Sequence, residues 1–272
     1  METSSQNLDP QEQLPPEDKD ALAGNRYKGL IHANMAVSVF LVLILAVGTI
    51  FAWGPVMQYR NTDPKFDGYV QPRSIANLVE LVQESTVSVY CNYGTEGEFD
   101  LGSGWAMDIE TDNEKEFPTA IITNFHVIEN CIDVEGTLFV SALGGKQQPA
   151  VIDNWDKEND LAVVATKLKL KPLELSSNNP SPGYWVMAIG TADGYEGSVA
   201  FGNVLNVTDS EVLITAAISG GNSGGPLVDN EGKVIGTNSW SATKEQYNGA
   251  MSLDAMCIGI MQCDRDTYWE WD

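Results

Sequence analysis

The chain has 272 residues and a net charge of −23. This length suffices for one large domain or two small ones with a substantial hydrophobic core, so an enzyme is possible. Residues 1–53 hold six acidic and three basic residues, so nearly all of the negative charge belongs to the rest of the chain. An acidic surface favours solubility and disfavours nucleic acid as a partner.

A long apolar segment begins near residue 33. No charged residue occurs from Ala33 to Tyr59, and residues 35–53 read MAVSVFLVLILAVGTIFAW. As a helix these nineteen residues span about 28 Å, which matches the hydrocarbon core of a bilayer. A cleaved signal peptide is the competing interpretation, but its apolar run is normally shorter than this one. Here a polar leader, residues 1–32, also precedes the apolar run, which does not fit a signal peptide. We therefore expect a single transmembrane anchor at residues 33–54.

The segments on either side of the apolar run are polar. Residues 1–32 are rich in Gln, Pro, Asp and Glu, and this composition predicts a disordered tail. Residues 55–75 are predicted to be a linker. Basic residues occur on both sides of the apolar run, so the positive-inside rule leaves the orientation open.

Four cysteines, Cys91, Cys131, Cys257 and Cys263, all follow the apolar run. They form no C-x-x-C pair and have no companion histidines, so we expect no zinc or other metal site. An even number fits two disulfides in an oxidising compartment outside the cytoplasm, whereas four unpaired buried thiols are the alternative. We predict the pairs Cys91 with Cys131 and Cys257 with Cys263, although the sequence alone allows three pairings.

After an amphipathic stretch, SIANLVELVQEST, the apolar segments become short and are separated by turn residues. Six strands are predicted at 86–91, 103–109, 117–123, 137–142, 148–153 and 160–166. A polar segment with prolines (171–183) separates them from six more, at 184–190, 198–206, 211–217, 225–228, 233–239 and 249–253. No long amphipathic helix alternates with these strands, so a parallel α/β sheet is not expected. The pattern predicts an all-β fold of two six-stranded antiparallel β-barrels, about 76–168 and 182–256, preceded by the transmembrane helix.

A glycine-rich segment, ISGGNSGGPLV (218–228), surrounds Ser223. Gly221, Ser223 and Gly225 satisfy G-x-S-x-G, a nucleophile motif that does not by itself choose a fold. A serine hydroxyl needs a base to act as a nucleophile, and the two histidines are His32, beside the apolar run, and His126. Both precede Ser223, so the chain order of an α/β-hydrolase triad cannot be assembled. His126, which follows the apolar strand in TAIITNFHVIENC, is the candidate base.

A third group must hold the imidazole in the correct tautomer and stabilise its charged form. Asp160 opens the apolar segment DLAVVAT, and Asp153 and Asp156 in VIDNWDKEND are nearby rivals. We favour Asp160, because a buried orienting carboxylate needs the apolar setting that follows it.

Several segments resemble those of a known protein family. TNFHV, the D-L-A of NDLAVVAT, and GNSGGPLV resemble the three signature segments of the chymotrypsin-like serine endopeptidases, in particular the bacterial HtrA/Deg-type members. GSGWAMD (102–108) and WVMAIGTA (185–192) are similar to that group's early strand and to the opening strand of its second barrel. The resemblance covers about residues 75–260, and it implies chymotrypsin-like barrels in a trypsin-like protease domain at 76–272.

The resemblance implies a role for each site residue. His126 would be the general base and later the acid, Asp160 its orienting partner and Ser223 the nucleophile. The N–H groups of Gly221 and Ser223 would form the oxyanion hole. No cofactor is implied.

The same resemblance points to a substrate pocket. Ser239 stands where a serine often contacts the triad aspartate, and Trp240 follows it beside the specificity pocket. Ala217 stands six residues before Ser223, where members that cleave after basic residues carry an acid. We therefore expect an uncharged pocket that takes apolar or small residues.

The leading hypothesis is a single-pass protein of the cell membrane with an extracytoplasmic catalytic domain, a serine endopeptidase that hydrolyses exposed or unfolded polypeptides. HtrA proteases usually continue into PDZ domains, but here only QCDRDTYWEWD follows Met261, so regulation through such a module is not expected. The alternatives are a binding or scaffolding protein on a protease-like fold, and an esterase that uses the same triad. The sequence makes no prediction of oligomeric state.

Overall fold

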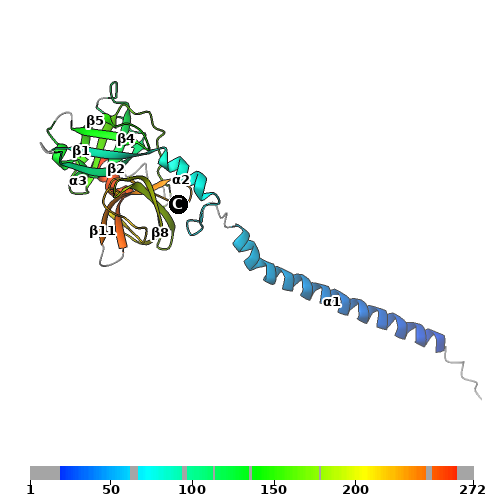
Figure 1. Ribbon diagram of the computed structural model, residues 1–272. Coiled ribbons are helices and arrows are strands. Elements are labelled where there is room, and N and C mark those ends of the chain that lie inside the picture. Colours follow the sequence, from blue (N-terminus) through cyan, green and yellow to red (C-terminus); the bar gives the residue numbers. More distant parts are fainter. Residues whose placement is uncertain are drawn as a thin grey trace, which may run out of the picture. The chain divides into compact units, whose positions relative to one another are not determined.

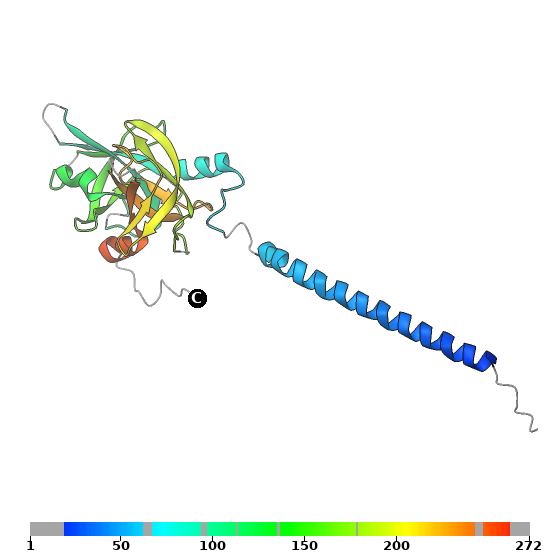
Figure 2. The ribbon, with the colours of Figure 1, turned by 90° about the horizontal axis from the view of Figure 1, so that it is seen from below.

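The computed structural model describes residues 19–61, 67–93, 97–112, 114–134, 137–177, 179–242 and 247–261. The chain divides into two units, Met1–Thr62 and Asp63–Asp272. The first contains helix α1 and the second contains all of the strands (Figures 1 and 2).

Helix α1 (Lys19–Asn61) is 43 residues long. Its segment Tyr27–Thr49 has a mean hydropathy of 2.4 and is long and apolar enough to cross a membrane. The side chains of this segment are exposed.

The helix extends beyond the anchor predicted at 33–54. It includes residues 19–32, which belong to the predicted tail, and residues 55–61, which belong to the predicted linker. The physical reason is that helix nucleation is costly but propagation is not, so an established apolar helix continues into flanking residues of adequate propensity. The remainder of the predicted tail, residues 1–18, lies outside the described residues.

The first barrel closes in the order β1-β2-β3-β6-β5-β4. Its strands, all paired antiparallel, are β1 (Thr86–Asn92), β2 (Phe99–Met107), β3 (Thr119–Thr123), β4 (Leu138–Ala142), β5 (Gln148–Asp156) and β6 (Leu161–Thr166). Helix α3 (Phe125–Ile128) and the 3-10 turn η1 (Glu129–Cys131) follow β3. The structure joins Cys131, at the end of this turn, to Cys91 on β1 by a disulfide.

The second barrel closes in the order β10-β11-β12-β9-β8-β7. Its strands, also antiparallel, are β7 (Trp185–Ala192), β8 (Tyr195–Val207), β9 (Glu211–Ile214), β10 (Pro226–Val228), β11 (Val234–Ala242) and β12 (Tyr247–Ser252). The prediction of two six-stranded antiparallel barrels is thus confirmed.

Each barrel has its own core, and a third apolar cluster joins the two barrels. The shared cluster includes Trp105 and Ile122 from the first barrel, and Met187 and Ile189 from the second, all fully buried. Helix α2 (Ile75–Gln83) adds Val82 to this cluster, consistent with its amphipathic sequence. The burial of the apolar side chains of this shared cluster stabilises the contact between the two barrels.

A C-terminal segment also connects the barrels. Helix α4 (Leu253–Met256) and the π-helical turn η2 (Cys257–Met261) follow β12 of the second barrel, and η2 packs against β5 and β6 of the first. Ile260 of this segment belongs to the shared cluster. Cys257 is disulfide-bonded, but Cys263 lies outside the described residues, so the pairing of these two cysteines stays a prediction.

Replacing Cys91 by Val and Cys131 by Ala should lower the free energy of unfolding by about 3–4 kcal/mol. The expected loss reflects the 40-residue separation of the two cysteines, because the cross-link removes loop-closure entropy from the unfolded chain. Valine and alanine keep much of the apolar volume of these buried side chains. Urea unfolding of the double variant and the wild type measures the difference, and a loss below about 1 kcal/mol would contradict the expectation.

Candidate active site

The first barrel presents His126 on the short helix α3, directly after strand β3. The neighbours Phe125 and Val127 are buried and fix the helix on the barrel, whereas 48% of the His126 side chain is exposed. Its Nδ1 atom lies 2.9 Å from Oδ2 and 3.0 Å from Oδ1 of Asp160. The backbone N–H of His126 also donates to Asp160 Oδ1 at 3.0 Å. The imidazole is therefore oriented through Nδ1, and Nε2 is left for another partner.

Asp160 precedes strand β6 and has a φ of 50°, an uncommon value for a residue other than glycine. Aspartate tolerates this left-handed conformation better than most residues. The buried Asn124 fixes it further, because Asn124 Nδ2 donates to the Asp160 carbonyl at 2.7 Å. Ser239 Oγ donates to Asp160 Oδ2 at 2.6 Å from strand β11. The carboxylate is thus held by donors from both barrels.

These contacts determine the charge state of Asp160. Burial alone would raise the pKa of its carboxyl, but the hydrogen bonds from His126 and Ser239 and the charge of the imidazole outweigh burial. The pKa of Asp160 is lowered as a result. The two rivals are engaged elsewhere: Asp153 accepts from the Asp112 N–H, and Asp156 accepts from the Glu158 N–H.

The second barrel presents Ser223 in the loop before β10. Gly221 and Gly224 have φ values of 93° and 87°, which favour glycine. A Cβ atom on Gly221 would overlap the Thr191 carbonyl oxygen, and one on Gly224 would overlap the Ser103 carbonyl oxygen. The glycines of the motif therefore allow both an unusual backbone and close packing against neighbouring strands.

Two backbone donors beside Ser223 remain available. Within the described part of the chain, no protein acceptor takes the N–H of Gly221 or of Ser223. In a trans peptide the C=O and N–H groups point in opposite directions. The Gly220 carbonyl accepts from the Asp193 N–H at 2.6 Å, and the Asn222 carbonyl accepts from the Gly225 N–H at 3.0 Å. Both free N–H groups are thus aimed away from these contacts.

Ser239 connects the two halves of the site. Its hydroxyl donates to Asp160, and its carbonyl accepts from Ser223 Oγ at 2.9 Å. Ser223 and His126 are both described by the structure, and no hydrogen bond joins their side chains. The hydroxyl of Ser223 therefore rests on the Ser239 carbonyl in this structure.

The predicted pocket residues have different surroundings. Ala217 is exposed, and Ser239 is buried against Asp160. Trp240 donates from Nε1 to Glu211 Oε1 at 2.8 Å, and its ring lies where a Cβ atom on Gly249 would be. Their role in binding substrate stays a prediction.

Sequence reasoning did not assign roles to two buried residues. Asn124 fixes the Asp160 backbone, and Ser103 Oγ donates to the Gly221 carbonyl at 2.6 Å. The signal for Ser103 was present in GSG, since Cβ atoms on Gly102 and Gly104 would crowd Val127 and Ile121. In the described residues, no group of three or more His, Cys, Asp or Glu side chains could hold a metal ion.

The lowered pKa of Asp160 predicts a pH-dependent contribution to stability. A carboxyl with a lowered folded-state pKa stabilises the fold above its unfolded pKa of about 3.9, and this contribution is lost as the pH falls through the folded value. The wild type should therefore be more stable than Asp160→Asn at pH 6, and the gap should close as the pH falls below about 4. Urea unfolding across this range measures the gap, and a gap of constant size from pH 6 to pH 3 would contradict the assignment.

Comparisons with known proteins agree with this geometry. Residues 102–236 match the family described as a trypsin-like peptidase domain. The chain is 36% identical over 129 residues to "Probable periplasmic serine endoprotease DegP-like" of Chlamydia pneumoniae, covering 43% of this chain and 26% of that protein. It is 32% identical over 186 residues to "Serine protease HTRA3" of Mus musculus, covering 60% of this chain and 39% of that protein. It thus spans well under half of the length of these relatives.

A solved structure is also similar. The crystal structure of the serine endoprotease from Yersinia pestis superposes with a TM-score of 0.58 at 26% identity, covering 71% of this chain and 67% of that one. The segment that matches the trypsin-like peptidase family, residues 102–236, contains His126, Asp160 and Ser223. The two barrels are therefore a chymotrypsin-like fold, and the domain that they form is similar to the trypsin-like, HtrA-type serine proteases.

Proposed function

We propose that this protein is a membrane-anchored serine endopeptidase that hydrolyses extracytoplasmic polypeptides through His126, Asp160 and Ser223. The observation that carries the proposal is the arrangement around Ser223. A histidine oriented through Nδ1 by a carboxylate lies on one barrel, and a serine lies on the other, where its own N–H and that of Gly221 have no acceptor among the described residues. A carboxylate-oriented base, a nucleophile and free amide donors are the components of acyl transfer.

The proposed reaction begins with a rotation of the Ser223 side chain. Turning about the Cα–Cβ bond would release its hydroxyl from the Ser239 carbonyl and direct it to Nε2 of His126. Catalytic hydrogen bonds are often long or unmade without substrate and form in the complex. His126 then takes the proton as Ser223 Oγ attacks the scissile carbonyl carbon, and Asp160 stabilises the imidazolium.

The tetrahedral intermediate carries a negative oxygen, which the N–H groups of Gly221 and Ser223 would bind. Its collapse breaks the peptide bond, and His126 donates its proton to the leaving amine. The acyl-enzyme that remains on Ser223 is hydrolysed by water, with His126 acting again as the base. No metal or cofactor is needed for these steps.

Two observations support the substrate class and the location. The relatives are named as serine proteases, and one of them as periplasmic. Helix α1 offers an apolar segment of membrane-spanning length before the barrels. Ala217 is uncharged and exposed, which supports a preference for apolar or small residues at the cleavage site.

A binding protein on the same fold is the alternative. One observation favours it, namely that the hydroxyl of Ser223 is bonded to Ser239 rather than to His126. Such a protein would keep the fold and the disulfide but would not turn over a polypeptide substrate.

A fluorophosphonate probe should label the wild-type protein at Ser223, because only an activated serine reacts rapidly with it. Ser223→Ala should lose both the labelling and the hydrolysis of denatured casein. Ser219→Ala is the matched control, since it removes another serine from the same loop and should keep both activities. An unlabelled, folded wild type that leaves casein intact would favour the binding protein.

The anchor is tested by extraction of membranes with alkaline carbonate. The wild type should stay in the membrane pellet. Leu43→Arg together with Ile44→Arg should shift the protein to the soluble fraction, because each charge at the centre of a span costs about 3 kcal/mol. The control, Leu43→Ile with Ile44→Leu, keeps the apolar character and should stay in the pellet. Release of the wild type would contradict the anchor.

A further inference from the structure

Ser103 of strand β2 joins three segments of the protein at one buried point. Its side chain is fully buried. Its Oγ donates to the Gly221 carbonyl at 2.6 Å and accepts from the Thr191 N–H at 2.8 Å. Its backbone N–H donates to the Ser223 carbonyl at 2.7 Å. The residue lies on the first barrel, but these three contacts are with the second.

The contacts of Ser103 complete a series along the loop. Every carbonyl from Gly220 to Ser223 accepts a hydrogen bond, and the donors are in order Asp193 N–H, Ser103 Oγ, Gly225 N–H and Ser103 N–H. Three of these donors are backbone groups, which a substitution leaves in place. The Ser103 hydroxyl is the one side-chain donor among the four. It is therefore the contact in this series that depends on the identity of an amino acid.

The peptide that Ser103 Oγ holds lies between the two proposed oxyanion donors. The Gly221 N–H belongs to the peptide before it, and the Ser223 N–H belongs to the peptide after it. Its orientation sets ψ of Gly221 and φ of Asn222, and these angles fix how the two donors lie relative to each other. Glycine at 221 gives little conformational resistance of its own. Without the hydroxyl, the carbonyl of Gly221 would lose its buried partner, and this peptide would be held only through the Asn222 N–H, which donates to the Ser219 carbonyl at 3.1 Å.

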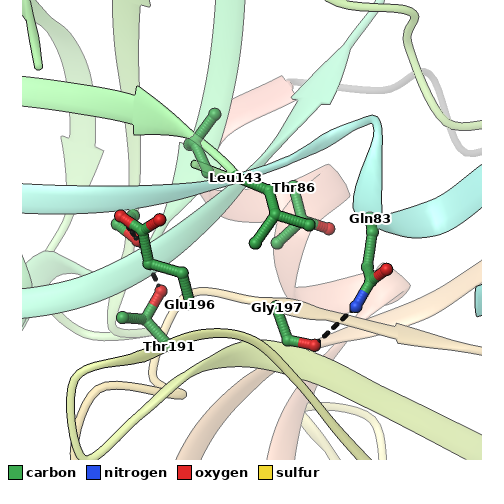
Figure 3. Close-up of a pocket in the computed structure, with 8 residues that line it drawn as sticks. Gln83, Thr86, Leu143, Thr191, Glu196 and Gly197 are labelled. Atoms are coloured by element: carbon green, nitrogen blue, oxygen red, sulfur yellow. Dashed lines mark hydrogen bonds between the residues drawn. The ribbon is translucent and has the colours of Figure 1, made fainter. Parts of the chain in front are cut away.

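The second partner of Ser103 is itself fixed to the first barrel. Thr191 Oγ1 lies 2.6 Å from Ser88 Oγ of β1, and Thr191, near the end of β7, and Glu196, near the start of β8, both project toward that barrel (Figure 3). The Glu196 carboxylate accepts from four donors of the first barrel, namely Ser88 Oγ at 3.5 Å, Tyr90 Oη at 3.1 Å, Ser141 Oγ at 3.1 Å and the Gly144 N–H at 3.0 Å. These contacts keep the Thr191 N–H in place. Ser103 Oγ thus has a fixed donor on one side and the loop carbonyl on the other.

We propose that Ser103 is a positioning residue for the oxyanion hole, which acts through the Gly221 carbonyl to keep the N–H groups of Gly221 and Ser223 in their productive orientation. The proposal rests on the proposed protease function, and it adds a residue that touches neither the substrate nor the reacting atoms. Its effect should therefore be on the transition state, where the oxyanion exists, and not on the binding of the substrate.

The test compares the full-length wild type with Ser103→Ala, using labelled denatured casein and a fluorophosphonate probe. The variant should lose about 10- to 100-fold in kcat, below the 10²- to 10³-fold caused by outright removal of an oxyanion donor. The rate of labelling should fall in parallel, and KM should stay within about twofold. Inhibition by phenylboronic acid, which forms a tetrahedral adduct on the serine, should weaken in the same proportion as kcat.

Ser252→Ala is the matched control for loss of a buried hydroxyl. Ser252 Oγ also donates to a backbone carbonyl, that of Asp209 at 2.7 Å, and accepts a backbone N–H, that of Ala255 at 3.1 Å. It lies at the end of β12 and makes none of the contacts of the candidate active site. Its urea midpoint should shift as that of Ser103→Ala does, whereas its kcat and labelling rate should match the wild type.

If Ser103→Ala does not fold, Ser103→Cys decides, because a thiol is nearly isosteric and a far weaker donor. A folded Ala or Cys variant with undiminished kcat would overturn the inference about Ser103 and would leave the proposed protease function in place. Equal loss of kcat in Ser252→Ala would also overturn it, since the effect would then be general destabilisation. A wild type that neither labels nor cleaves casein would overturn the proposed function and this inference with it.

Discussion

The carboxylate of Asp160 accepts hydrogen bonds from both barrels at once, and the candidate site depends on this shared acceptor. His126 reaches it from the first barrel and Ser239 from the second. A partly buried carboxylate is costly unless its oxygens are bonded, and bonds to a charged acceptor are about twice as strong as neutral ones. The lowered pKa of Asp160 means that the donors more than offset burial. The same group therefore orients the histidine and fixes the second barrel against the first.

The remaining polar groups at this junction are not all satisfied. Three buried amide oxygens have no hydrogen-bond partner among the described residues, and they belong to Asn124, Asn222 and Asn238. Asn124 lies two residues before His126, and the other two directly precede Ser223 and Ser239. An unpartnered buried oxygen costs about 1–3 kcal/mol, and such costs persist only where the surrounding structure enforces them. These unpartnered oxygens lie beside the candidate catalytic residues. Functional sites are where a protein is expected to keep a destabilising feature for the sake of activity.

Much of this architecture could be predicted from the sequence, because alternating apolar residues and turn residues mark short strands, and chain order indicated the candidate triad. The ends of α1 could not, since helix propagation into polar flanks leaves no apolar signal. The GSG glycines indicated close packing, but the three contacts of Ser103 arise only when β2 meets a loop more than a hundred residues later. The resting bond of Ser223 to the Ser239 carbonyl was also beyond reach, because a backbone acceptor carries no mark in the sequence.

The segment after β12 has a consequence for how the domain unfolds. α4 and η2 leave the second barrel and pack on β5 and β6 of the first, and Ile260 enters the cluster that both barrels share. Neither barrel can open without exposing apolar surface that belongs to the other. The two halves should therefore melt in a single cooperative transition despite their separate cores, with no stable half-folded species that would expose the seam to aggregation.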